Sequence, residues 1–469
     1  MDEGYTINAV LSIQEHGSTV LDSGNEYSCL TYCYITAYIA KSFGNNAFSF
    51  RLLSVLAGIF FIATIFYITK RFFGNTIGLV TSVFVTFSYW QIAWSRQVRW
   101  YTLFALFFWL AIFFFYKFTQ TEDKKEKIKL FMGIALFTLL SYLTHGLGYL
   151  LPFIFVAWYF IEEIFIKKKN SWKRPLIWVS ISLALISTFD MTLGSHLLQK
   201  LFENINFNYN LPYHLSFILR NYWLFILFAL YAVYAPDKEN RHLRYFLIFI
   251  FLAYLTFLSF LTNIVHYRYL FHVSPVLIIL GTLGMHDVYL LINKKWQRAG
   301  FIILIALLFF TFGGGVLKHK EMYLLEADNP ETIGARPHYS YTPQPDWNKA
   351  YAFIKENKTE EEIVISSLPH FNKIFLGIPG YWIKYNYMGL TDRESKTVNN
   401  KEFYVNAETL NNLEEVKSLT RDFHGYIIFD FMAINGKIDG EIIDYIESKF
   451  DLVFYHKINT YSRVWVYKF

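Results

Sequence analysis

Residues 52–69, LLSVLAGIFFIATIFYIT, form an unbroken apolar run without a charged side chain. Arg51 precedes the run, and Lys70 and Arg71 follow it. A helix needs roughly 20 apolar residues to cross the hydrocarbon core of a bilayer. The run therefore predicts a membrane-spanning helix whose flanking cations lie in the headgroup regions.

Similar apolar runs recur over the first two thirds of the chain. The whole sequence is 54% hydrophobic and only 17% charged, whereas a soluble domain carries about 25% charged residues. We therefore expect a polytopic α-helical membrane protein with about ten spans. The further runs, of which 76–94 and 128–144 are the weakest, are 76–94, 102–118, 128–144, 146–166, 175–194, 216–235, 244–264, 270–292 and 299–317.

Lysine and arginine concentrate on alternate loops between these runs. By the positive-inside rule the rich loops face the cytoplasm, so both chain ends are expected on the outer face of the plasma membrane. A polar N-terminal segment would then have to cross the membrane ahead of the first span, which is an unfavourable insertion. We therefore expect a further helix upstream of Met1. The rich loops are 70–75, 117–129, 167–174, 236–244 and 293–298.

The pattern changes after the last run. Residues 347–469 alternate short helical and strand patterns, which predicts a small soluble α/β domain outside the membrane. The expected organisation is an outer loop with surface helices at 1–49, a transmembrane bundle at 50–317, an irregular proline-containing linker at 318–346 and this domain. Frequent Lys, Asn, Ile and Phe favour a bacterial source. The net charge of +6 is modest and does not indicate nucleic-acid binding.

Cys29 and Cys33 are the chain's two cysteines, four residues apart in a segment of helical pattern. We expect two small apolar helix residues rather than a disulfide, because bridging them would strain the helix. The spacing is not that of a redox or zinc motif, and no cluster of Cys and His predicts a metal site.

Ionisable residues at the predicted outer boundary are the candidates for chemistry. Asp2 and Glu3 form an acidic pair, although acids at a chain end are commonly just solvated. Arg96 and Arg99 lie three residues apart in the outer loop 95–101, beside Tyr101. Snorkelling to lipid headgroups would explain one of them. Two arginines beside a tyrosine more readily indicate a phosphate site, because guanidinium groups match phosphate oxygens.

Further candidates follow in the same outer segments. Arg268, in HYRYL, supplies another cation between two tyrosines, and His145 lies at the tip between two spans. Taken alone, His145 is better explained as a helix-turn residue than as a catalytic one. Asp190 and Arg220 lie within or at the ends of spans, where ionisable groups are costly and usually have a partner or a role. The remaining acids of the first segment are Glu15, Asp22 and Glu26.

The order of these motifs resembles a known family. The acidic pair is followed by RLLSVLAG, SRQVRWYTLFAL, YLTHGLGYLL and RYLFHVSPVLIIL. This succession is similar to the GT-C glycosyltransferases of family 39 in the broad sense, the protein O-mannosyltransferase and aminoarabinose-transferase type. The resemblance covers about residues 1–292. Each motif alone is degenerate, so the resemblance rests on their order.

The resemblance implies an inverting transfer of a sugar from a polyprenyl-phosphate carrier to an acceptor hydroxyl outside the cytoplasm. Asp2 would be the general base and Glu3 would position the acceptor or the base. The family's donor-side residues correspond to Arg51, Arg96, Arg99, Tyr101 and Arg268. His145 is a further candidate for binding the donor. The sequence departs from the family because no helix precedes the acidic pair and because Glu26-Tyr27-Ser28-Cys29 replaces a double proline.

Two other classes of function compete with this reading. A transporter or flippase for a lipid-linked glycan would use the same arginines, but the sequence has no internal repeat and no matching pair of broken spans. A non-catalytic membrane scaffold would not explain the arginines at the outer boundary. Arginines can replace a metal at a leaving phosphate, so no cofactor is firmly implied. Binding of Mg²⁺ or Mn²⁺ by the acidic pair stays an alternative.

Overall fold

The structure is a computed structural model that falls into two units, Met1–Phe50 with His319–Phe469, and Arg51–Lys318. The predicted span 175–194, Glu26 and nearly all of the linker 318–346 lie outside the described residues. The described residues are 2–24, 29–163, 207, 209–234, 241–262, 266–312, 314–315, 346–384, 397–398, 401–402, 404–431, 433–434, 438–457 and 463–469.

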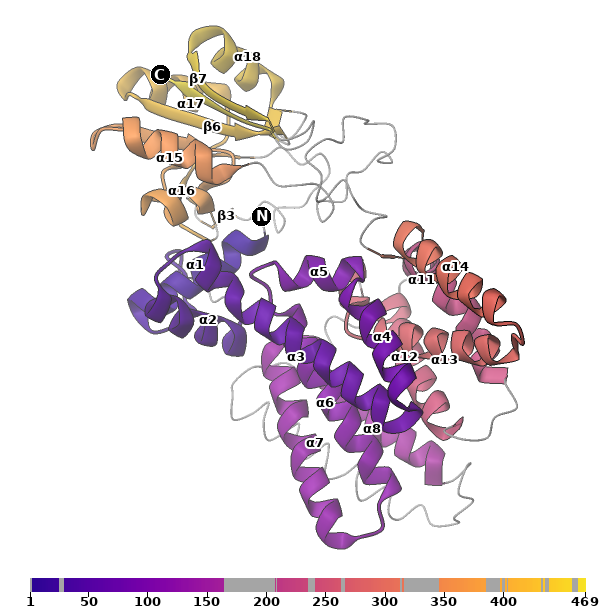
Figure 1. Ribbon diagram of the computed structural model, residues 1–469. Helices are drawn as coiled ribbons and strands as arrows, with labels where there is room; N and C mark the ends of the chain where they lie inside the picture. Colours follow the sequence, from indigo (N-terminus) through magenta and orange to yellow (C-terminus); the bar gives the residue numbers. More distant parts are fainter. Residues whose placement is uncertain are drawn as a thin grey trace. The chain divides into compact units, whose positions relative to one another are not determined.

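The second unit is a bundle of apolar helices (Figure 1). Among the described helices, five are long and apolar enough to cross a membrane, namely α3, α6, α7, α11 and α12. This confirms a helical membrane protein, while the number of spans stays a prediction. The helices are α3 (Ala47–Phe73), α4 (Asn75–Thr86), α5 (Tyr89–Ser95), α6 (Tyr101–Gln120), α7 (Lys124–Thr144), α8 (Leu150–Ile161), α11 (Leu211–Tyr234), α12 (Arg241–Phe260), α13 (Pro275–Leu291) and α14 (Lys295–Thr311), with 3-10 turns η1 (Gly146–Tyr149) and η3 (Tyr267–Leu270).

The predicted single span 76–94 was wrong. It is divided between α4 and α5, because the chain turns at Ser88, whose backbone is extended. The N–H of Tyr89 donates to the carbonyl of Gly314 at 3.0 Å, and Ser88 forms a β-bridge with Gly315. A pairing partner more than 200 residues away is invisible to local periodicity. The break brings α5 and the following arginine loop to the end of the bundle.

Two glycines set how closely α11 and α13 pack. A Cβ added at Gly281 would lie 2.7 Å from Cα of Phe225, and one added at Gly284 would overlap the carbonyl of Phe228. Small residues in a helix interface let two membrane helices bring their backbones together.

We expect Gly284→Ala to destabilise the protein by about 1–3 kcal/mol, because the added methyl group would force the two backbones apart. Thermal unfolding in detergent measures the loss. Gly300→Ala in α14 is the matched control, because a Cβ there meets no atom within 4 Å. Equal melting temperatures for both variants would contradict the close packing.

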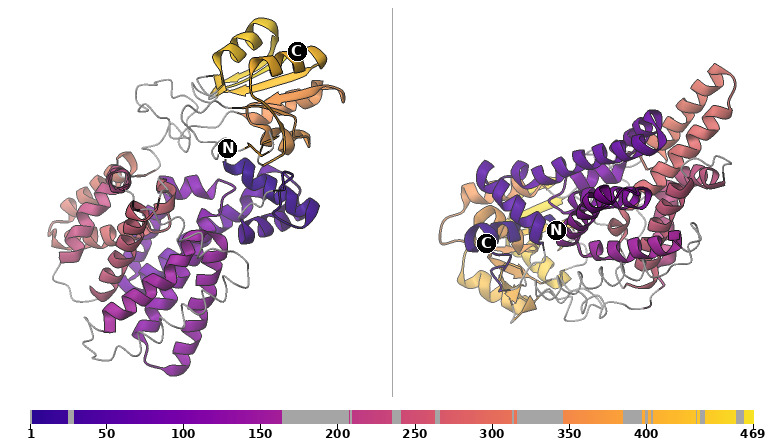
Figure 2. Two further views of the ribbon diagram at one scale, coloured as in Figure 1. Left: turned by 180° about the vertical axis from the view of Figure 1, so that it is seen from behind. Right: turned by 90° about the horizontal axis from the view of Figure 1, so that it is seen from below.

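The N-terminal part of the first unit is a helical hairpin. Helix α1 (Asp2–His16) and helix α2 (Leu30–Phe43) lie side by side in both views of Figure 2. Gln14 Nε2 in α1 donates to the carbonyl of Ala37 in α2 at 3.1 Å. The sequence pattern predicts a short amphipathic helix at 31–43, and α2 confirms it.

The two cysteines form a disulfide, contrary to expectation. Cys29 is the N-cap of α2, with φ −152° and ψ 40°, and therefore lies outside the regular helix. The Cα atoms of Cys29 and Cys33 are 5.5 Å apart, within the range that a disulfide needs. The predicted strain does not arise, because only one of the two residues has helical geometry.

The C-terminal part of the first unit is an α/β layer structure. Its sequence patterns predict helices at 347–357, 411–423 and 440–450 and strands at 361–368, 425–431, 450–458 and 462–469, and the structure has the expected element in each range. Strands β2 to β5 and helix α16 were not expected. The helices are α15 (Trp347–Asn357), α16 (Pro369–Leu376), α17 (Leu413–Asp422) and α18 (Gly440–Lys449), and the strands are β1 (Ile363–Ser366), β2 (Tyr381–Ile383), β3 (Thr397–Val398), β4 (Lys401–Glu402), β5 (Glu408–Leu410), β6 (Gly425–Asp430), β7 (Asp451–Lys457) and β8 (Arg463–Lys468).

Within the described residues the strands form one sheet with the order β3-β4-β5-β2-β1-β6-β8-β7. Strand β1 pairs in parallel with β2 on one side and with β6 on the other. Strand β6 is buried throughout and forms the centre of the hydrophobic core. Because the chain leaves β1 toward β2 and later returns on its other side as β6, a topological switch lies at the carboxyl ends of β1 and β6.

Candidate active site

The loop between α5 and α6 holds Arg99 in place. Ser54 Oγ in α3 donates to the carbonyl of Arg99 at 3.1 Å, and Thr102 Oγ1 donates to the carbonyl of Ser54 at 3.0 Å. The guanidinium carbon of Arg99 lies 4.1 Å from the centre of the Trp100 ring and 5.8 Å from that of Tyr101. Arg99 is 6% exposed. It is therefore a buried cation supported on an aromatic surface.

His145 lies between α7 and η1. Its Nδ1 accepts a hydrogen bond from the N–H of Leu147 at 3.0 Å. A neutral imidazole that accepts at Nδ1 carries its proton on Nε2, which is then a donor. Burial, and then the charges of Arg99 and Arg268, lower the pKa of His145. The ring is therefore neutral at physiological pH.

Arg268 enters the same region from η3. Its guanidinium carbon lies 5.4 Å from the centre of the Tyr269 ring, and that ring lies 5.4 Å from the ring of His145. These groups surround a small, narrow pocket. Its lining residues are Tyr101, Phe104, His145, Leu147, Arg268, Tyr269, Phe271 and His272.

The structure thus brings together several predicted donor-side residues. Arg268, Tyr101 and His145 line the pocket, and the charge of Arg99 acts on His145. We call Arg99, Tyr101, His145 and Arg268 the cation cluster.

Other predicted residues lie apart from the pocket lining. Arg96 is exposed at the C-cap of α5. Arg51 in α3 and Arg220 in α11 are also exposed. Asp190 lies outside the described residues.

His272 is a pocket residue that the sequence analysis did not single out. It is 2% exposed, and its ring lies 4.7 Å from that of Phe104 and 4.6 Å from that of Tyr254. Its backbone carbonyl accepts from Trp109 Nε1 at 2.8 Å. The signal was a histidine at the start of an apolar run, in RYLFH, which looks like an ordinary core residue.

A second set of buried ionisable groups escaped the sequence analysis. Helix α8 is followed by Glu162 and Glu163, which are 0% and 4% exposed. His242 Nε2 at the start of α12 lies 3.6 Å from Glu162 Oε1. Helix α12 also contains buried Arg244, whose Nη1 donates to the carbonyl of Ala232 at 2.6 Å. These groups lie inside the bundle, where Glu162 pairs with His242 and Arg244 bonds to a backbone carbonyl. They do not line the pocket described above.

The acidic pair lies in the first unit, at the start of α1. Asp2 begins the helix, although its side chain lies outside the described part, and Glu3 is partly buried in the first turn. Carboxylates are stabilised at a helix N-terminus by its partial positive charge. The pair is thus carried by a formed helix.

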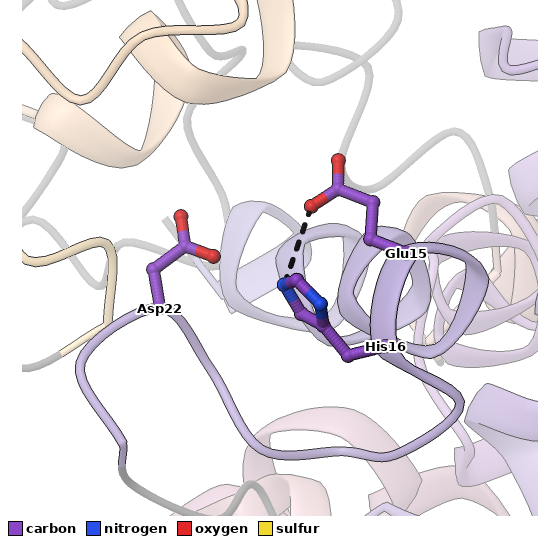
Figure 3. A group of neighbouring side chains, drawn as sticks. All are labelled: Glu15, His16 and Asp22. Carbon is purple, nitrogen blue, oxygen red and sulfur yellow. Dashed lines mark ion pairs between the residues drawn. The ribbon is translucent and has the colours of Figure 1, made fainter.

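Three other groups of this segment, Glu15, His16 and Asp22, come close enough for metal binding (Figure 3). All three are exposed. Lys373 Nζ lies 3.1 Å from Asp22 and 3.8 Å from Glu15. The two carboxylates already have a cationic partner, so we assign them a structural role.

The lowered pKa of His145 predicts an acid sensitivity. The unfolded chain binds a proton near pH 6.5 that the folded protein binds only at lower pH, so stability is lost as pH falls below 6.5. In His145→Gln the drop in melting temperature between pH 7 and pH 5.5 should be smaller by about 2 °C or more. The same change at exposed His424 is the control, and equal effects in the two variants would contradict this electrostatic account.

Comparisons with known proteins identify the fold. Residues 29–191 match the family model described as dolichyl-phosphate-mannose-protein mannosyltransferase. The structure is similar to the crystal structure of ArnT from Cupriavidus metallidurans bound to undecaprenyl phosphate, with TM-score 0.60 and 15% identity over 100% of this chain and 93% of that one. The chain has the GT-C fold. The resemblance to GT-C enzymes of the family 39 type is confirmed.

A second GT-C structure is also similar. It is the oligosaccharyltransferase of Archaeoglobus fulgidus tethered to an acceptor peptide, with TM-score 0.56 and 12% identity over 97% of this chain and 68% of that one. No curated protein sequence matches this chain significantly. At these identities the GT-C fold is shared, and the site must be argued from the chain's own residues.

Proposed function

We propose that this protein is an inverting glycosyltransferase that moves a sugar from a polyprenyl-phosphate carrier to an acceptor hydroxyl on the outer face of the membrane. The observation that carries the proposal is the cation cluster, in which Arg268 and His145 line one pocket, Nε2 of His145 is a donor, and the charge of Arg99 acts on His145. A buried guanidinium at Arg99, a partly buried one at Arg268 and a neutral N–H donor suit a phosphate.

The chemistry needs stabilisation of a leaving phosphate. The acceptor oxygen attacks the anomeric carbon, the bond from that carbon to the carrier phosphate oxygen breaks, and the hydroxyl proton passes to a carboxylate, for which we propose Asp2. Negative charge grows on the phosphate as the bond breaks, and Arg99 and Arg268 offset it in a low-dielectric site. Attack on the face opposite the leaving group inverts the anomeric centre.

The outer-face location has two kinds of support. The loop charges predict it through the positive-inside rule. The Cys29–Cys33 disulfide in the first unit is the second, because disulfides persist in oxidising compartments outside the bacterial cytoplasm. We therefore propose that the C-terminal α/β domain is also extracytoplasmic.

The acceptor class is a hydroxyl of a protein, a lipid or a glycan. The cations that face the phosphate let the proposed reaction proceed without a cofactor. Mg²⁺ or Mn²⁺ at the acidic pair is the alternative. Sugar transfer that survives EDTA treatment would support the metal-free form, and loss restored by added Mn²⁺ would support the alternative.

Turnover tests the proposal. Purified protein in lipid nanodiscs would be given undecaprenyl-phosphate hexoses and pentoses with labelled sugars, together with a cell-envelope extract as the source of acceptor. We expect one donor to release free undecaprenyl phosphate as its label enters the acceptor fraction. Donors that stay intact but cross the bilayer of reconstituted vesicles would instead show a transporter.

A further inference from the structure

The start of helix α1 packs against the C-terminal domain, within the first unit of the structure. The Tyr5 ring stacks on the Tyr404 ring, with centres 3.8 Å apart and planes at 18°. It also lies 4.9 Å from the ring of His370. Tyr5 is 8% exposed. The contact therefore buries an aromatic side chain that lies next to Gly4 and two positions from Glu3 in the sequence.

His370 is the centre of this contact. It follows β1 and lies in the first turn of α16, close to the topological switch of the sheet. Its side chain is 2% exposed, and its backbone carbonyl accepts from Asn8 Nδ2 at 3.5 Å. Ligands and partner segments commonly bind where two parallel strands diverge in this way. Here the segment that contacts this position is α1.

Gly4 makes the approach of α1 feasible. A Cβ added there would overlap Cδ2 of the His370 ring. The backbone of the helix, next to the acidic pair, therefore rests directly on a buried imidazole. Any other residue at position 4 would displace either the ring or the helix turn that carries Glu3.

The far end of the same helix is fixed as well. Lys373, one turn after His370 in α16, pairs with Glu15 at 3.8 Å and with Asp22 at 3.1 Å. Helix α1 is thus held against α16 near both of its ends, which fixes its axis and its rotation better than either contact alone.

We infer that the C-terminal α/β domain positions the acidic pair, with His370 and Gly4 as the positioning residues. This inference rests on the proposed function of Asp2 and Glu3. A general base must lie within hydrogen-bond reach of the proton that it removes, and a displacement of about 1 Å can cost 10²-fold in rate. The domain thereby acts on catalysis through the acidic pair.

Gly4→Ala in the full chain tests the inference. Alanine favours helix more than glycine does, so a loss of activity cannot come from a weaker helix. We expect kcat for release of undecaprenyl phosphate to fall about 10²-fold, with the Kd for undecaprenyl phosphate within twofold of wild type. Gly300→Ala, where a Cβ meets open space, is the matched control and should keep wild-type turnover.

A second variant separates positioning from misfolding. Gly4→Ala combined with His370→Ala restores room for the methyl group, so its kcat should exceed that of Gly4→Ala alone by about tenfold. Hydrogen exchange of the amides of residues 4–8 should be faster in Gly4→Ala and slower again in the double variant. Turnover of Gly4→Ala within twofold of wild type would overturn the inference. If the wild type turned over none of the donors, this would instead contradict the proposed function.

Discussion

Asp2→Asn lowers sugar transfer by roughly 10²–10⁴-fold if Asp2 is the general base, since that is the usual contribution of such a group. Asparagine has nearly the same shape but cannot accept the hydroxyl proton. Binding of undecaprenyl phosphate should stay unchanged, because the phosphate is assigned to the cation cluster. Turnover and binding would be measured on the same nanodisc preparation.

The control for this change is Asp422→Asn, which alters an exposed aspartate paired with Arg421 in the C-terminal domain. It should leave turnover at the wild-type level. Full turnover in Asp2→Asn would remove Asp2 from the mechanism. A similar loss of turnover and of carrier binding would show that Asp2 acts on the donor rather than on the acceptor.

Arg99→Ala and Arg268→Ala should each weaken binding of undecaprenyl phosphate by about 10–150-fold. A hydrogen bond to a charged group contributes about 1.5–3 kcal/mol, and 1.4 kcal/mol corresponds to a factor of ten. Arg99→Ala also uncovers the Trp100 ring on which the guanidinium lies. Fluorescence quenching or calorimetry with undecaprenyl phosphate measures the change.

Arg268→Lys refines this test. Lysine keeps the charge but loses the planar fork that matches two phosphate oxygens, so its affinity should fall between those of the wild type and Arg268→Ala. Arg421→Ala, at an exposed arginine in the other unit, is the control. Wild-type affinity in both alanine variants would defeat the assignment of the phosphate to this cluster.

Local patterns were sufficient for much of the fold. The apolar runs predicted the long helices of the bundle but not the division of 76–94 into α4 and α5, and alternating patterns predicted the main elements of the α/β domain. Strands β2 to β5 escaped because they have only two or three residues each, too few for a periodic signal. The break at Ser88 escaped because its partner is Gly315. The disulfide was not expected, because the start of α2, which decides the geometry of Cys29, could not be located from the helical pattern.

In the candidate site too, residues with a local sequence signal were predicted and residues without one were not. Arg99, His145 and Arg268 stood out because charged or titratable groups are rare beside membrane spans. His272 did not, because a histidine in an apolar run resembles a core residue. The support of α1 by His370 could not be read from the sequence, because the two segments are 362 positions apart at the Asn8–His370 contact.

One structure would test the central claim most directly. The protein would be determined by electron cryomicroscopy in nanodiscs with undecaprenyl phosphate bound. We predict that the phosphate lies within about 3 Å of guanidinium nitrogens of both Arg99 and Arg268, the usual hydrogen-bond distance. A carrier phosphate bound elsewhere, with neither arginine in contact, would contradict the account.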